Sequence, residues 1–444
     1  MRPNSVRPVR SLLLAGALTF AASTSAFALE GLPLFQSLVE QGNGKVTWAS
    51  VEERGSDSFT MRDVRVTGGD GKETAIASLS ADALREGADD TIIFDTMVAE
   101  GLAFAPTQRG DRATVDRVAL NGATLPRKFS YGSMKPLDAD SPNAVIASFE
   151  ASAIAVTGTE FSFTMGSLTV NGLDMPATDK GTGASNSFMQ PYSDASFDDV
   201  SFSIAGKTIA GMKRLAAVVS KEDGSGTIRS TSTLEGLMLD LTALPDERSR
   251  AIAGQLGYET IRGEGTGAST YNPTTGRAEL EALDLRFEDA LDVSMTMIVN
   301  GYTQAVAQQV QKLASQAQGA GGSMPMAQML PLLEQITLEN LNLTLTDRSL
   351  TGRLLDFQAA QMGTTGEQLA MSAPLFLSMG MGGLGMPGLT EMVSGAVGTF
   401  LQNKGALSVT ISPPQPVSVA TIATVSQADP KALPDLLGLS ITAR

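Results

Sequence analysis

The feature that most constrains this fold is an apolar rhythm that recurs along the chain. Two apolar residues lie two positions apart, the next follows after three positions, and another comes two positions later. Residues 113–126 repeat this rhythm at 163–176, and residues 147–158 repeat it at 195–206. A period of two is typical of a strand with one buried face, and a skip of three moves the following side chains to the other face, as a bulge or bend does. An ordinary amphipathic strand shares the period, but its skip would not recur at the same place, so the pattern favours bent strands.

Further copies of the rhythm extend the pattern over most of the chain. Residues 280–290 match residues 338–348, and single variants lie at 59–68, 92–101 and 234–241. Glycine- and aspartate-rich breaks separate the early copies, as hairpins require. The sequence therefore predicts a mainly β fold with minority α, built on an elongated, curved antiparallel sheet of repeated bent strands.

Helical spacing is predicted in a few places and is concentrated toward the C-terminus. An early helix carries Leu34 to Val39, and another covers 246–256. After Asn300 the predicted elements are a helix from Thr303 to Ala317, a helix capped by Ser349 that carries Leu350, Leu354 and Phe357, a helical stripe over 389–401, and a strand at 407–411.

We expect three regions along the chain. Residues 1–28 form a signal peptide, residues 29–300 form a β-repeat region with long loops at 179–193 and 221–232, and residues 301–444 form a helix-rich α+β region. Strand rhythm on both sides of each loop indicates that neither loop is a domain boundary. The last region is a possible continuation of the same sheet.

The amino terminus predicts export. Arg2, Arg7 and Arg10 precede an apolar run at 12–22, and Ala26-Phe27-Ala28 follows as a small-residue cleavage site. Cleavage after Ala28 would leave a mature chain that begins at Leu29 and lies in the periplasm. The apolar run is too short to span a bilayer, so we expect no transmembrane segment in the mature chain.

Composition excludes several chemistries. The chain has no cysteine and no histidine, which removes the common nucleophile systems and histidine-based zinc sites. Its formal charge of −15 would become −18 without the three signal-peptide arginines, so nucleic acid is not an expected partner. No cofactor or metal is predicted, because a G-x-G-x-x-G match at 380–385 lacks its βαβ unit and the acidic pairs lack calcium-loop spacing. We expect a protein that is not an enzyme, and the remaining catalytic alternative is a carboxylate-dependent glycoside hydrolase.

One uncharged segment is the best candidate for ligand contact. Residues 368–390 carry no charge, and methionines alternate there with glycines that would make the segment pliable. The predicted apolar-ligand contacts are Leu375, Leu377, Met379, Met381, Leu384 and Met386. The alternative is a buried helix-loop-helix whose side chains fill a core.

The phrases at 119–126, 149–158, 234–242 and 338–350 resemble the bent strands of AsmA-like and related repeating β-groove envelope proteins of Gram-negative bacteria, or of a related exported family of unknown function. The resemblance covers about residues 45–350 and rests on strand rhythm. It implies an envelope protein that handles lipid along a sheet. AsmA-like proteins usually keep an amino-terminal membrane anchor, whereas this chain is expected to be cleaved and released.

Three functional hypotheses follow. The first is a non-enzymatic envelope protein that binds lipid or another apolar ligand along a curved sheet, with the segment at 368–390 covering the sheet. The second is a periplasmic protein-interaction scaffold that binds other envelope proteins, and the third is the glycoside hydrolase.

Overall fold

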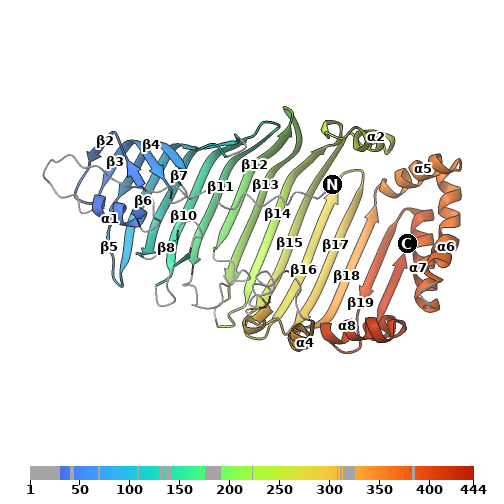
Figure 1. Ribbon diagram of the computed structural model, residues 1–444. Helices are drawn as coiled ribbons and strands as arrows, with labels where there is room; N and C mark the ends of the chain where they lie inside the picture. The colour runs from blue at the N-terminus through green and yellow to red at the C-terminus, as the bar shows by residue number, and fades with distance from the viewer. Residues whose placement is uncertain are drawn as a thin grey trace. The chain divides into compact units, whose positions relative to one another are not determined.

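The structure is a computed structural model in which strands and helices follow one another in a clear order (Figure 1). It describes residues 31–40, 45–68, 71–107, 110–127, 129–130, 135–136, 142–175, 192–222, 224–307, 309–310, 313, 326–382 and 386–444. The predicted signal peptide and the candidate contact Leu384 lie outside the described residues, as do residues 179–191 of the first predicted loop.

Of the described residues, 52% lie in strands and 28% in helices, which confirms the predicted mainly β class. The helices lie mostly toward the C-terminus, also as predicted. The chain divides into two compact units. Unit 1 comprises residues 1–185 and 190–206, and unit 2 comprises residues 186–189 and 207–444.

Unit 1 is an antiparallel sheet with one helix. Its elements are α1 (Gly31–Glu40), β1 (Lys45–Thr47), β2 (Ser50–Glu53), β3 (Phe59–Thr67), β4 (Glu73–Asp82), β5 (Arg85–Glu86), β6 (Thr91–Phe104), β7 (Arg112–Pro126), β8 (Phe129–Ser130), β9 (Lys135–Pro136), β10 (Ala144–Thr157), β11 (Phe161–Met175) and β12 (Asp194–Ile204). The pairing runs β3–β4–β6–β7–β10–β11–β12, with β1 and β2 on the outer side of β3 and β5 beside β6. β8 and β9 form a separate hairpin.

The predicted skips correspond to two lines of bends that cross this sheet. In β7 the apolar positions jump over Asp116 and then over Gly122, and both positions interrupt the regular pairing with β6 and β10. Gly122 has a φ of 57°, a left-handed value that glycine adopts readily. A Cβ on Gly122 would lie 2.9 Å from the Cβ of Ala147 on β10, so the strands approach closely there. Each bend restores the apolar side chains to the core face, which explains why the rhythm repeats at the same place.

Helix α1 packs on the core face of unit 1. The four apolar residues that predicted this helix, Leu34 to Val39, are all buried, and the rings of Phe35 and Phe59 lie 5.6 Å apart. The core continues under the sheet through fully buried side chains such as Met61 and Ile92. Unit 1 is therefore held by a continuous apolar core.

Unit 2 combines further antiparallel strands with most of the helices. Its elements are β13 (Lys207–Lys221), β14 (Ile228–Asp240), η1 (Leu241–Ala243), α2 (Glu247–Gln255), β15 (Thr260–Asn272), β16 (Arg277–Phe287), β17 (Leu291–Asn300), α4 (Met326–Gln335), β18 (Thr337–Asp347), α5 (Leu350–Met362), α6 (Gly366–Gly382), α7 (Pro387–Asn403), β19 (Ala406–Ile411), β20 (Val417–Ser418), α8 (Val419–Ala428), η2 (Pro430–Ala432), α9 (Leu433–Leu437) and β21 (Leu439–Ala443). The pairing runs from β13 to β19 in chain order, followed by β21, and β20 pairs with the start of β18. The helix-rich region after residue 300 therefore continues the sheet that precedes it.

Several predicted elements of unit 2 are confirmed and others need correction. Helix α2 and strand β19 lie where the sequence placed them. The second predicted loop, 221–232, is too long, because β13 ends at Lys221 and β14 begins at Ile228. Residues 230–233 are all serine or threonine, and this polarity indicated a loop. Their exposure nevertheless alternates along β14, as it does in a strand.

The start of helix α5 also differs from the prediction. Ser349 occupies the N-cap position, but its hydroxyl bonds the carbonyl of Asp289 and makes no cap. The carboxylate of Asp347 instead accepts a hydrogen bond from the Thr351 amide at 2.7 Å. The buried face of α5 carries Thr351, Leu355 and Ala359, whereas Leu354 of the predicted stripe is exposed.

Candidate functional site

The sheet of unit 2 carries a grid of apolar side chains on one face. Strand pairing aligns three rows of five residues across β16, β17, β18, β19 and β21. The rows are Leu285–Val293–Leu345–Leu407–Ala443, Leu283–Met295–Leu343–Val409–Ile441 and Leu280–Met297–Leu341–Ile411–Leu439. Residues that pair directly across an antiparallel sheet share a face, so all fifteen point to the same side. We call this set the apolar grid.

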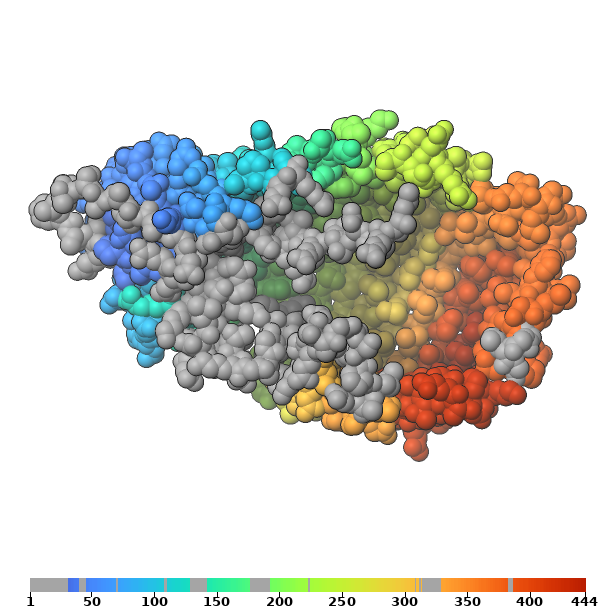
Figure 2. Space-filling view, in the orientation of Figure 1, coloured from blue at the N-terminus to red at the C-terminus, as the bar shows by residue number. Residues whose placement is uncertain are grey.

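All fifteen residues of the apolar grid are half-buried, and none reaches full burial. In unit 1, by contrast, many core-face side chains of β3 to β10 are fully buried, whereas those of β11 and β12, such as Leu168 and Val200, are partly buried. Figure 2 shows the sheet of unit 2 set back behind a rim, with α2 along one side, α5 and α6 along the next, and α4 and α8 along a third. An apolar ligand that fits within this rim would complete the burial of the apolar grid.

Strand β15, next to the apolar grid, carries glycines on the same face of the sheet. Gly263 and Gly265 occupy positions on the apolar face opposite Phe287 and Leu285. A Cβ on Gly265 would lie 2.6 Å from a methyl carbon of Leu285, so this side chain lies flat across β15. The glycines therefore make room for the grid side chains to spread sideways.

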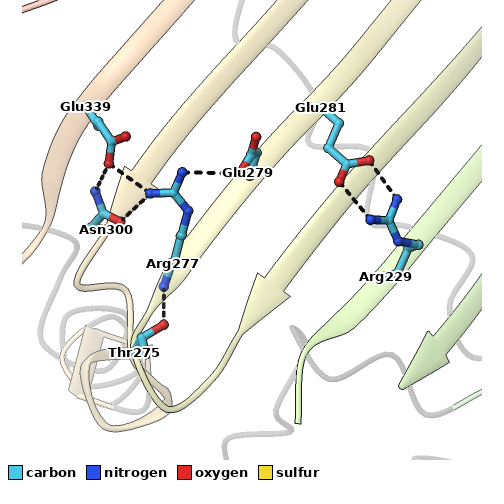
Figure 3. Close-up of polar contacts among 7 residues, drawn as sticks. All are labelled: Arg229, Thr275, Arg277, Glu279, Glu281, Asn300 and Glu339. Atoms are coloured by element: carbon cyan, nitrogen blue, oxygen red, sulfur yellow. Dashed lines mark hydrogen bonds and ion pairs between the residues drawn. The ribbon is translucent and has the colours of Figure 1, made fainter. Parts of the chain in front are cut away.

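The other face of the same strands carries charged side chains (Figure 3). Figure 3 views the strands in the opposite left-to-right order from Figure 1, so it looks onto the face away from the hollow. Arg277 donates to Glu339 at 2.9 Å, to Asn300 at 3.2 Å and to Glu279 at 3.3 Å, and Asn300 donates to Glu339 at 2.8 Å. We call these four residues the Arg277 cluster.

A second ion pair also joins an arginine to a glutamate two strands further along the sheet. Arg229 of β14 binds Glu281 of β16 through two hydrogen bonds of 2.8 and 3.0 Å. Glu281 and Glu339 occupy the same position in the repeated L-E-x-L phrase, and each lies where the strand carries a bulge. In unit 2, each skip in the apolar rhythm therefore places a glutamate at a bulge. An arginine two strands away neutralises the charge of that glutamate.

The electrostatics of the Arg277 cluster favour a structural role. Hydrogen bonds from Asn300 and then from Arg277 hold the pKa of Glu339 below its ordinary value. The same carboxylate raises the pKa of Arg277. A general acid in glycoside hydrolysis needs a raised carboxyl pKa, and this carboxyl group is shifted the other way. Both charges stay on at neutral pH and hold the bulged strands together.

Helix α6 contains most of the candidate contacts that the sequence singled out. The segment at 368–382 is helical, with Pro374 inside the helix. Leu375 and Met379 are exposed, whereas Leu377 and Met381 are half-buried. Met386 precedes α7 as its N-cap residue. Because α6 packs on α5 and α7, it lies at the rim and not over the sheet.

Sequence reasoning missed both the apolar grid and part of the α6 surface. The strict alternation of Leu291, Val293, Met295, Met297 and Val299 was available as a strand signal. Helical spacing also connects Met371 to Leu375 and Met379, and Phe376 adjoins them. What the pattern could not show is that these side chains remain partly uncovered.

No group of three or more acidic side chains is placed to hold a metal ion in the part of the chain that the structure describes. None of the described helices combines the length and apolar character needed to cross a membrane.

A comparison with known families gives a match to part of the chain. A family model described as "Uncharacterized protein" matches residues 284–444. This range includes α6 and nearly all of the apolar grid, and it leaves out Arg277, Glu279 and Glu281. Curated proteins include no match to this chain.

Proposed function

We propose that this protein is a non-enzymatic, exported envelope protein that binds an acyl chain or a similar elongated apolar ligand on the apolar grid of unit 2. The observation that carries this proposal is the half-buried state of all fifteen grid residues. The resemblance of the strand repeats to β-groove envelope proteins favours the same function.

The extent of the apolar grid indicates an elongated ligand. A Kd of 1 μM corresponds to about 8 kcal/mol. Full burial of one large apolar side chain contributes about 1.5–3 kcal/mol, and the grid side chains are already partly buried. A compact ligand that covers one or two of them would therefore bind weakly, whereas a chain lying across the rows would cover many.

Titration with a fluorescent fatty acid tests the proposal. Met295→Gln changes the centre of the grid to a polar side chain of similar length, and we expect it to raise the Kd about fivefold, which corresponds to about 1 kcal/mol. Thr296→Gln places the same side chain on the opposite face of β17 and should leave the Kd unchanged. No binding by the wild-type chain, or equal effects of the two variants, would refute the proposal.

Native mass spectrometry with lipid extraction adds an independent measurement. Protein purified without detergent should carry extractable acyl chains, and their amount should fall in Met295→Gln but not in Thr296→Gln. The same spectra test export, because the mature chain should begin at Leu29. An intact Met1 on protein recovered from the periplasm would contradict the predicted cleavage.

A further inference from the structure

Four exposed apolar side chains lie together on the outer side of α6. Met371, Leu375 and Met379 follow one another at helical spacing, and Phe376 adjoins Leu375. These residues are 58%, 62%, 70% and 54% exposed, in the order Met371, Leu375, Met379, Phe376. Single exposed apolar residues are ordinary, but a contiguous group usually marks an interaction site. We call these four residues the α6 stripe.

The inner side of the same helix fixes its orientation. Ala370 is buried, and Pro374 packs so closely on α7 that a Cβ on Gly398 would lie 2.5 Å from the Pro374 ring. Helix α5 packs on α6 as well. The α6 stripe therefore faces outward because the opposite side of the helix is held.

Charge selects among the classes of partner. No charged residue lies between Glu367 and Glu391, and both of these flanking residues are acidic. A bilayer rich in anionic lipid attracts lysine and arginine, which this segment lacks. A protein partner would usually meet a rim of polar and charged side chains around the apolar patch. An uncharged, acid-flanked stripe is complementary to the neutral boundary between headgroups and acyl chains.

We propose that the α6 stripe docks on the surface of a neutral, zwitterionic lipid bilayer. Helix α6 would lie in the plane of the interface with its four exposed side chains inserted among the upper acyl carbons. The inference rests on the proposed function, since a bilayer is where this protein would collect or deliver an acyl chain.

Flotation of the full chain with phosphatidylcholine vesicles tests the docking. The double variant Leu375→Asp/Met379→Asp should reduce the vesicle-bound fraction at least tenfold. The control Gln358→Asp/Gln361→Asp adds the same charge at exposed polar positions of α5 and should float like the wild-type chain. Matching melting temperatures would show that both variants fold. Equal flotation of the two variants, or wild-type binding that requires phosphatidylglycerol and disappears in salt, would overturn the proposal.

Two further measurements separate the docking surface from other roles. In vesicle-free solution, Leu375→Asp/Met379→Asp should bind the fluorescent fatty acid like the wild-type chain, and Met295→Gln should still float. Loss of fatty-acid binding in the α6 variant would show that the α6 stripe belongs to the ligand site. That result would overturn the docking proposal and leave the proposed function standing. Sedimentation of a wild-type dimer that the α6 variant dissociates would show a second copy on the stripe and would also overturn the proposal.

Discussion

At the scale of single residues, small side chains allow the sheet of unit 1 to bend. Gly101, Gly122 and Gly172 have left-handed backbone conformations inside strands, and Ala153 and Asp199 share this conformation. The residue opposite Gly101 is Ala77 and the residue opposite Gly122 is Ala147, with Cβ approaches of 2.8 and 2.9 Å. The bends thus depend on pairs of small residues and not on glycine alone.

Replacement of Gly122 by alanine should separate the cost of the left-handed backbone from the cost of the close approach to Ala147. We expect Gly122→Ala to lower the free energy of unfolding by about 2–3 kcal/mol, because the new Cβ adds a collision with Ala147 to the cost of the left-handed backbone. Gly110→Ala is the control, since Gly110 has a φ of 85° with open space around it, and it should cost about 1 kcal/mol. Urea unfolding measures both, and equal losses would show that the close approach to Ala147 does not matter.

The ionised Arg277 cluster should make stability depend on pH. The pKa of Glu339 is lowered in the folded chain, so folding favours its ionised form. This contribution is complete above the ordinary glutamate pKa of about 4.3 and is lost as the pH falls through the lower folded value.

Glu339→Gln removes this titration. Because the Arg277 and Glu339 side chains are 41% and 37% exposed, solvent screening limits the contribution to about 1 kcal/mol or less. Wild type and variant should therefore differ at pH 6 and converge toward pH 3, as measured by urea unfolding. Glu264→Gln, at a more exposed ion pair with Arg286, should show a smaller difference at pH 6. A Glu339→Gln difference that persists at pH 3 would contradict this account.

At the scale of elements, helix α5 depends on a residue of the preceding strand for its start. Helix α5 begins directly after β18, and the carboxylate of Asp347 at the end of β18 binds the first-turn amide of Thr351. Ser349 meanwhile bonds Tyr258, whose ring lies 4.2 Å from the guanidinium carbon of Arg353. The hydroxyl that sequence reasoning assigned to the cap therefore joins α5 to the segment after α2.

Substitution of Asp347 tests which residue starts the helix. Asp347→Ala should lower the free energy of unfolding by about 1 kcal/mol, the usual cost of losing a capping acceptor. Asp347→Asn keeps an acceptor oxygen and should recover most of that loss. If Asn proves as costly as Ala in urea unfolding, the carboxylate does not cap α5.

At the scale of the whole molecule, the two units differ in how completely they bury their apolar faces. Unit 1 has a continuous core with many fully buried side chains, whereas the apolar grid of unit 2 is only half-buried. A ligand that binds only the folded chain stabilises it by mass action, by about 2.7 kcal/mol at one hundred times its Kd. If the ligand binds the apolar grid, as we propose, it stabilises unit 2.

Hydrogen exchange with and without fatty acid should locate the effect. We expect amides of β16 to β19 to exchange more slowly when the fatty acid is present, and amides of β3 to β7 to be unchanged. The Met295→Gln variant should show a smaller change at the same fatty-acid concentration. Protection that is uniform across both units, or confined to unit 1, would place the ligand elsewhere.

The sequence by itself determined the local elements of this protein. The period of two and its skips located the long strands of unit 1, and the apolar face of residues 34–39 located α1, because both signals depend on neighbours a few positions away. The strand at 407–411 and the helix at 247–255 were accessible for the same reason.

Only the tertiary structure decided which of these surfaces stay uncovered and which charges meet. Leu283, Met295, Leu343 and Val409 form one row although they are far apart in the chain, and Arg277 meets Glu339 across 62 positions. Likewise, α6 leaves Leu375 exposed while it buries Ala370. Exposure depends on what packs against a side chain from distant parts of the chain, and the local rhythm of apolar residues carries no record of that packing.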